Sequence, residues 1–307
     1  MSPDGPKPVD RVVVGVGGVD DRRALDWATE EAAAHRVPLV VRHCVRGTPE
    51  VSCAPDGAVL PVATAEQRPE QRPSPTAEAM LKALVGEVES SHPGLTVRGE
   101  LLRGQPGPAL SAAALPGDLL VLAPHSRHRV AARLLGSTSS FLLAHAPCAV
   151  AALGPGAADT GRGPFAGHVV AAVDTGAASA GVVELAYAEA AVHDCPLAVV
   201  HVQREHGEVE GVTVDERTLE VGVVPFPADH ALLQAAVEPG RHRYPEVPVR
   251  RAAFRGPLPE VLRQAALGAR LLVLGRPRHP SWPLHLVDLL LARPGCPVVV
   301  APPPATT

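Results

Sequence analysis

Aromatic residues are scarce in this 307-residue chain, at 3% of the total, although 46% of its residues are hydrophobic. The core is therefore expected to be aliphatic, built from valine, leucine and alanine. The apolar runs are short, as in Leu119 to Leu122, and do not reach the roughly 20 residues that a membrane-spanning helix needs. Because the chain also lacks a basic-then-apolar segment at its start, we expect it in the cytoplasm without a membrane partner.

Cysteine and excess positive charge are also limited. The five cysteines form no CxxC pair, so we expect buried reduced thiols rather than a disulfide framework or a metal site. The net charge is -4 without a sustained basic stripe, which argues against a nucleic-acid partner. No Ser-His-Asp order, paired carboxylate motif or metal triad recurs along the chain. We therefore predict no catalytic residue and no metal ligand.

The chain consists of two copies of one pattern. The segment from Ala24, ALDWATEEAAAHRVPLVVRHC, aligns with the segment from Val182, VVELAYAEAAVHDCPLAVVHV, so that His35 and His193 occupy equivalent positions. Further along, GQPGPALSAAALPGDLLVLA aligns with GPLPEVLRQAALGARLLVLG. Each copy alternates strand-like and helix-like segments, a pattern that predicts a parallel sheet with helices on both faces.

The predicted fold class is therefore α/β, with two doubly wound, parallel, five-stranded sheet domains in tandem. We expect the first domain at 1–153 and the second at 168–307, joined by a Gly/Pro/Ala-rich linker at 154–167. Two long irregular stretches, 46–76 and 203–229, follow the second strand of each copy. Their composition leaves open whether they are functional lids or mobile segments.

The stretch from Asp118 to Val150 is the candidate ligand-binding region. It combines a buried strand, a basic loop, a Gly-Ser-Thr step (Gly136 to Thr138), a short helix and another strand. That order places a helix N-terminus at the carboxyl end of a parallel strand, where open α/β sheets bind ligands. A helix start offers free N–H groups and a positive dipole end, so it suits phosphate. The serine and threonine would also serve as plain helix caps.

These features together resemble the universal stress protein family in its tandem two-domain form. The resemblance is carried by the opening RVVVGVGG, by the segment GDLLVLAPHSRHRVAARLLGSTSSFLLAHAPCAVAAL, and by the second copy of each. It implies the adenine-nucleotide α-hydrolase-like fold and regulation through binding rather than turnover. Nucleotide-binding members of the family carry Gly-x2-Gly-x9-Gly-Ser/Thr after the fourth strand and an aspartate just after the first.

The first copy keeps only the helix-start end of this motif. The residues at the motif positions, with the basic neighbour that could donate to an anion, are Ala123, Ser126, Arg127, Gly136, Ser137 and Thr138. The aspartate position falls on Gly17. Because a Cβ replaces hydrogen at two of the three glycine positions, the backbone is expected to approach phosphate less closely. The serine hydroxyl and the arginine are expected to compensate in part.

The second copy keeps the complementary remnants of the motif. The aspartate is present as Asp174 and the first glycine as Gly275, whereas the second glycine is replaced by Arg278. Counting from either end of the motif finds no Gly-Ser step, and prolines such as Pro277 and Pro280 remove N–H groups from the loop. We therefore expect the second domain not to bind nucleotide, with Asp174 serving as a turn or cap residue.

Three functions remain open at this point. The first is a bacterial stress-response regulatory protein that holds ATP or another adenine nucleotide in its first domain. The second is a nucleotide-free interaction scaffold, a pseudo-dimer whose halves pack through their last strands, 149–153 and 297–301, and which binds an unidentified protein or a second copy of itself. The third is an ATP hydrolase, which rests on fold analogy alone.

Overall fold

The computed structural model describes residues 9–17, 21–45, 75–123, 136–154, 163–174, 178–203, 227–276, 282–292 and 296–302. The first half contributes, in chain order, β1 (Arg11–Val16), α1 (Arg22–His35), β2 (Leu39–Val45), α2 (Pro75–Ser91), β3 (Val97–Arg103), α3 (Pro106–Ala113), β4 (Asp118–Leu122), α4 (Ser137–His145) and β5 (Ala149–Ala152). The second half contributes β6 (Val169–Val173), α5 (Ala178–Val192), β7 (Leu197–Gln203), α6 (Pro227–Arg243), β8 (Val249–Arg255), α7 (Leu258–Ala265), β9 (Leu271–Gly275), α8 (Trp282–Ala292) and β10 (Val298–Ala301).

The predicted alternation of strands and helices is confirmed in both halves. Of the stretches predicted to be irregular at 46–76 and 203–229, residues 46–74 and 204–226 lie outside the described residues, as does most of the linker predicted at 154–167. The predicted bounds were wrong at the ends, where residues 75–76 begin α2, residue 203 ends β7 and residues 227–229 begin α6. The domain boundaries at 153 and 168 stay a prediction.

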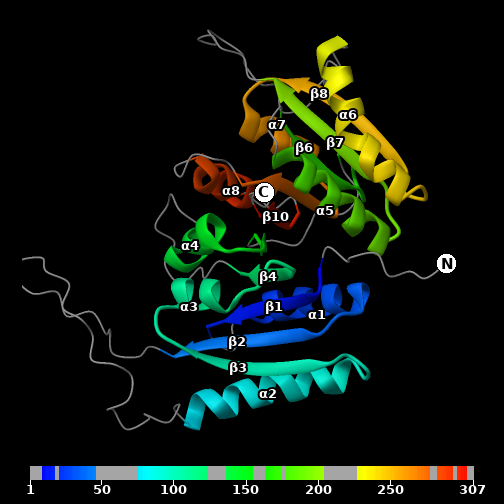
Figure 1. The fold of residues 1–307 in the computed structure, drawn as a ribbon. Coiled ribbons are helices and arrows are strands. Elements are labelled where there is room, and N and C mark those ends of the chain that lie inside the picture. Colours follow the sequence, from blue (N-terminus) through cyan, green and yellow to red (C-terminus); the bar gives the residue numbers. More distant parts are fainter. Residues whose placement is uncertain are drawn as a thin grey trace, which may run out of the picture.

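The strands join into one sheet that runs through both halves (Figure 1). Within the described residues its order is β3-β2-β1-β4-β5-β10-β9-β6-β7-β8. Neighbouring strands are parallel inside each half, whereas β5 and β10 pair antiparallel, with Ala152 opposite Val298 and Val150 opposite Val300. The last strands of the two halves, which the sequence predicts to pack together, thus lie side by side at the centre of the sheet.

Helices cover both faces of the sheet because the strands carry apolar residues on both sides. In β1, Val12 and Val14 belong to one core cluster and Val13 to the other, as the alternation of side chains along a strand requires. Helices α1, α2, α5 and α6 pack on the first face, and α3, α4, α7 and α8 on the second. Both clusters consist mainly of valine, leucine and alanine, which confirms the expected aliphatic core.

The first helix of each half ends in the same way. Arg36 follows α1 with φ 56° and ψ 47°, and its N–H donates to the carbonyls of Ala32 and Ala33. Asp194 follows α5 with φ 48°. This left-handed cap closes the helix, and the proline two residues later prevents the helix from continuing. Each chain copy therefore enters its second strand at the same point.

Four of the five cysteines lie in the described part of the chain. The described cysteines, Cys44, Cys148, Cys195 and Cys296, are free thiols. Burial raises the pKa of Cys148 and of Cys296 to about 12, so both stay protonated at neutral pH.

Of the helices in the described part of the chain, none has the length and apolar character needed to cross a bilayer.

The order of strands creates a reversal point in each half. The chain builds outward from β1 through β2 to β3 and then returns to place β4 on the other side of β1. Helices α3 and α4 consequently lie on the opposite face from α1 and α2. At such a reversal the loops after the two central strands diverge, and a crevice opens at their carboxyl ends.

Candidate functional site

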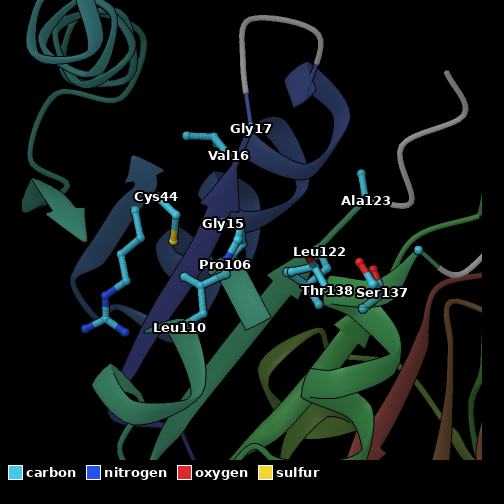
Figure 2. Close-up of a pocket in the computed structure, with 13 residues that line it drawn as sticks. Gly15, Val16, Gly17, Cys44, Pro106, Leu110, Leu122, Ala123, Ser137 and Thr138 are labelled. Carbon is cyan, nitrogen blue, oxygen red and sulfur yellow. The ribbon is translucent and has the colours of Figure 1, made fainter. Parts of the chain in front are cut away.

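A cavity of about 290 Å³ lies at the carboxyl ends of β1 and β4 (Figure 2). Its walls are formed by the end of β1, by β2, by the start of α3, by the end of β4 and by the start of α4. One representative of each, in that order, is Gly17, Arg42, Leu110, Ala123 and Ser137. The cavity thus occupies the reversal point of the first half, where the sequence predicts a ligand.

The structure brings most of the predicted site residues together. Ala123, Gly136, Ser137 and Thr138 all line the cavity, and Figure 2 shows Ser137 and Thr138 beside Leu122 at the end of β4. The other two predicted residues of the first domain, Ser126 and Arg127, lie outside the described residues. The same holds for the rest of the basic loop.

The start of α4 presents free backbone donors to the cavity. Gly136 is the N-cap residue, with extended backbone (φ -70°, ψ 172°), and no side chain caps the helix. Its carbonyl accepts the first intrahelical hydrogen bond, from Ser140 N–H at 3.0 Å. The N–H groups of the first turn have no partner within a helix, and they sit at its positive end. This end of the cavity is therefore suited to an anion.

Gly136 is not required by packing. A Cβ built there meets no atom within 4 Å, and the residue's φ is negative. Alanine would therefore fit this backbone without strain. The missing side chain instead leaves open space beside the first turn of α4, where a ligand could approach the backbone closely.

Arg42 supplies a buried positive charge at the cavity. The residue is 3% exposed, and its Nε donates to Glu100 at 2.8 Å. Its Nη1 is buried and has no hydrogen-bond partner in the structure. An unpartnered guanidinium nitrogen in such a place is costly unless an acceptor reaches it. Sequence reasoning missed Arg42, because a single arginine inside an apolar strand carries no motif.

The equivalent strand positions in the second half are apolar. Arg42 lies opposite Glu100 in the pairing of β2 with β3, and the matching pair in β7 and β8 is Val200 and Ala252. Both of those residues are buried in the core. The ion pair is thus specific to the first half at these positions, and the sheet does not need it to form.

Asp21 is a second residue that sequence reasoning missed. The position of the family's aspartate falls on Gly17, but the Gly17 N–H donates to the carboxylate of Asp21 four residues later. Asp21 is 6% exposed, and Gly17 lines the cavity. A carboxylate therefore still lies at the end of β1, supplied from the start of α1. Asp20 and Asp21, which follow the glycines at the end of β1, were the sequence signal that could have pointed to this carboxylate.

The remnants in the second half lie at the ends of neighbouring strands. Asp174 follows β6 and Gly275 ends β9, and these two strands are paired. The Ser179 hydroxyl lies 3.0 Å from the Asp174 carboxylate and 2.9 Å from its carbonyl, as in a local turn. Helix α8 begins at Trp282 and Pro283 rather than at a Gly-Ser step. Proline has no N–H to offer at this helix start.

The residue after Gly275 connects the two halves. Arg276 donates from Nη1 to the carbonyl of Ala146 at 2.7 Å and from Nη2 to the carbonyl of Cys148 at 3.4 Å. Burial lowers the pKa of Arg276. Because Ala146 is the C-cap of α4, the guanidinium meets the negative end of that helix. The residue at the head of the loop that would hold phosphate in the second half is thus hydrogen-bonded to the first half.

The first half of the chain matches a known protein family, and several relatives match most of the chain. Residues 8–153 match the model of the universal stress protein family. The chain is 28% identical to a universal stress protein of Mycobacterium tuberculosis over 310 residues, which covers 94% of each chain. It is also 28% identical to a universal stress protein of Mycolicibacterium smegmatis over 269 residues, 86% of each chain.

A solved structure shares the fold of the whole chain. The crystal structure of a universal stress protein from Archaeoglobus fulgidus has a TM-score of 0.62 at 14% sequence identity, covering 96% of this chain and 97% of that one. The likeness therefore extends across both halves of the sheet. Together with the internal repeat, these matches lead to one conclusion: the first half matches the universal stress protein family, and the chain as a whole is similar to universal stress proteins of the same tandem length.

Proposed function

We propose that the first half of this chain binds an adenine nucleotide, ATP or a close relative, and that the protein regulates a stress response through binding rather than turnover. The observation that carries this proposal is that one cavity is lined both by the uncapped start of α4 and by Arg42, a buried arginine with one unpartnered nitrogen. Both features favour a negatively charged group. Phosphate is the anion that helix N-termini hold most readily.

The two ends of the cavity differ in chemistry, as a nucleotide requires. The side toward α3 is apolar, with Pro106 and Leu110, and suits the flat face of a base. The side toward α4 is polar, with Ser137 and Thr138, and suits phosphate. The volume of about 290 Å³ is at the lower limit of small-molecule sites, which span about 300–1,000 Å³.

The second half is proposed to have no nucleotide site. Valine stands where the first half has Arg42, and the helix equivalent to α4 starts at Trp282 and Pro283. Arg276, at the head of the loop, is already hydrogen-bonded to carbonyls of the first half. We assign Asp174 and Gly275 as remnants of the motif.

Purified protein is expected to melt at a higher temperature when ATP and magnesium are added. A ligand that binds only the folded state at 100 times its dissociation constant stabilises that state by about 2.7 kcal/mol, which corresponds to a shift of roughly 5 °C for a chain of this size. Differential scanning fluorimetry measures the shift, and mass spectrometry of the denatured protein identifies any nucleotide that co-purifies. The absence of both a shift and a released nucleotide would contradict the proposal.

Substituting Arg42 by methionine is expected to weaken adenine-nucleotide binding by about 10- to 100-fold. The estimate follows from the roughly 1.5–3 kcal/mol that a hydrogen bond to a charged group contributes. Isothermal titration calorimetry with ATP and magnesium measures the loss. Arg98→Met, on the neighbouring strand and exposed, is the matched control and should bind as the unmodified protein does. Equal affinity of the two variants for ATP would show that Arg42 does not contribute to nucleotide binding.

The nucleotide-free scaffold is the alternative function. It is supported by the antiparallel pairing of β5 with β10 and by the hydrogen bonds of Arg276, which tie the halves into a pseudo-dimer. Under this alternative, protein purified from its own cells carries no nucleotide and is instead recovered with another protein or as a homodimer. The third function, ATP hydrolysis, would require that the protein hydrolyses ATP and that the Ser137→Ala variant loses this activity while its fold stays intact.

A further inference from the structure

Two glutamates and two histidines meet where the halves touch on the α1 and α5 face of the sheet. Glu31 and His35 lie one turn apart on α1, and Glu189 and His193 lie one turn apart at the end of α5. Figure 1 shows these helices on the same face of the sheet. One donor atom from each of the four side chains lies within 4.8 Å of all the others.

The internal repeat explains the symmetry of this cluster. Each copy carries a Glu-x3-His step on its first helix, as EAAAH in one and EAAVH in the other. The i and i+4 positions of a helix lie on one face, so each helix presents a carboxylate and an imidazole together. When the two copies face each other across the β5–β10 junction, four donors converge.

The four distances between a glutamate oxygen and a histidine nitrogen are compatible with a tetrahedral ion. Across the helices, His193 Nε2 lies 2.8 Å from Glu31 Oε2 and His35 Nε2 lies 3.2 Å from Glu189 Oε2. Within each helix the corresponding separations are 3.7 Å and 3.8 Å. A tetrahedron with ligand bonds of about 2.0–2.1 Å has edges of about 3.3–3.4 Å, which the observed distances bracket.

The burial of the cluster points to an additional partner. Glu189 is 1% exposed, and its Oε1 is buried without any hydrogen-bond partner. Glu31 and His35 are 3% and 7% exposed. Burying two carboxylates is costly, and a divalent cation between them would neutralise both charges.

We propose that Glu31, His35, Glu189 and His193 form a structural metal site that binds one divalent transition-metal ion, with zinc as the best fit, between the two halves. Two imidazole nitrogens and two carboxylate oxygens are a donor set that zinc accepts, and four protein ligands leave no open position for chemistry. The ion would hold α1 against α5. This site lies on the opposite face of the sheet from the helices α3 and α4 that form the nucleotide cavity, and it does not depend on nucleotide binding.

Arg270 competes with the metal for one of the ligands. Its Nη2 lies 2.6 Å from His193 Nδ1, and a guanidinium can only donate, so this nitrogen accepts. Metal binding at Nε2 requires a hydrogen on Nδ1 instead, together with a rotation of the Arg270 side chain, which is 43% exposed. Arg270→Gln offers an amide oxygen to that hydrogen and removes a positive charge. It is expected to tighten metal binding by roughly 10-fold, as outer-shell partners do.

The test uses the full-length chain treated with EDTA, dialysed and titrated with zinc chloride without nucleotide. Calorimetry and elemental analysis are expected to show one zinc per chain, with a higher melting temperature. Cobalt(II) is expected to give the intense visible absorption of a tetrahedral site. The affinity of the Glu31→Gln/Glu189→Gln double variant for zinc should fall by more than the 10- to 100-fold that is typical when a partner outside the ligand set is removed. His242→Gln is the matched control, because Glu238 and His242 repeat the same spacing on an exposed helix turn.

Two results would overturn the proposal. One is folded protein, checked by circular dichroism, that binds no zinc in one-to-one ratio. The other is a double variant that binds zinc as tightly as the unmodified chain. If the double variant does not fold, Arg270→Gln decides the question, since it changes only a half-exposed side chain: unchanged or weaker affinity in that variant contradicts the assigned geometry.

Discussion

Replacing Arg11 by methionine is expected to lower the free energy of unfolding by about 3 kcal/mol, at the lower end of the range for breaking a buried ion pair. Arg11 Nε and Nη2 donate to the two carboxylate oxygens of Asp118 at 2.5 Å and 2.9 Å. These hydrogen bonds raise the pKa of Arg11. Asp118 is 2% exposed, so the variant would leave its carboxylate buried with only the Leu115 N–H as partner.

The position of this pair explains the size of the effect. Arg11 and Asp118 are direct neighbours in the pairing of β1 with β4, the two strands whose ends border the cavity of the first half. Removing the cation therefore strains the same strand pair that positions the candidate site. We chose methionine because it keeps the length of the aliphatic stem and removes only the charge and its hydrogen bonds.

Urea unfolding measures the loss, and two further variants make the result specific. Arg42→Met should leave stability nearly unchanged, because Glu100, its carboxylate partner, is 40% exposed and stays solvated. Adding Asp118→Asn to Arg11→Met should restore part of the lost stability, since a neutral amide is cheaper to bury than a carboxylate. Equal stabilities of Arg11→Met and Arg42→Met would show that burial of Asp118 is not what matters.

Truncating Leu291 to alanine is expected to lower the free energy of unfolding by about 2–5 kcal/mol. Leu291 lies on α8 of the second half and is 1% exposed. It belongs to the same core cluster as Leu142 and Leu143 of α4, in the first half. A Cβ added at Gly154 would meet its side chain at 3.6 Å, so the chain leaving β5 also packs closely against it. The cavity left by alanine would therefore open between the halves.

The same helix supplies the control for this prediction. Leu289 is 54% exposed, two residues away, and its substitution by alanine should change stability by no more than about 0.5 kcal/mol. Both variants are to be compared by urea unfolding followed with circular dichroism. Because the sheet continues from β5 into β10, the unmodified chain is expected to unfold in one transition. A Leu291→Ala chain as stable as Leu289→Ala would mean that α8 contributes little to the contact between halves.

The alternation of strands and helices in each half could be predicted from the sequence because its signals are local, whereas the joining of both halves into one ten-stranded sheet was not predicted. Runs such as Leu119 to Leu122, helical spacing of apolar residues and the internal repeat each depend on neighbours in the chain. The repeat then places the last strands, β5 and β10, in equivalent positions. The motif residues Gly136, Ser137 and Thr138 could also be located in advance, since the helix start that holds them is defined by a few consecutive residues.

Other parts of the site could not be predicted, because they depend on how individual side chains are placed in the fold. Arg42 has its carboxylate partner Glu100 on the next strand, and only packing shows that its second nitrogen is left without one. Asp21 accepts a hydrogen bond from the Gly17 N–H, although the family motif places its aspartate at position 17. In both cases the side chain's role depends on what surrounds it.

By itself, the sequence determined that this protein is a tandem α/β repeat with a helix start suited to phosphate in its first half and a degraded counterpart in its second, since those features follow from short-range patterns. Tertiary structure alone decided that the Glu-x3-His steps of the two copies face each other, and that Arg276 is bound to the carbonyls of the other half. The physical reason is the antiparallel pairing of β5 with β10, which continues the sheet from one half into the other and so brings α1 against α5.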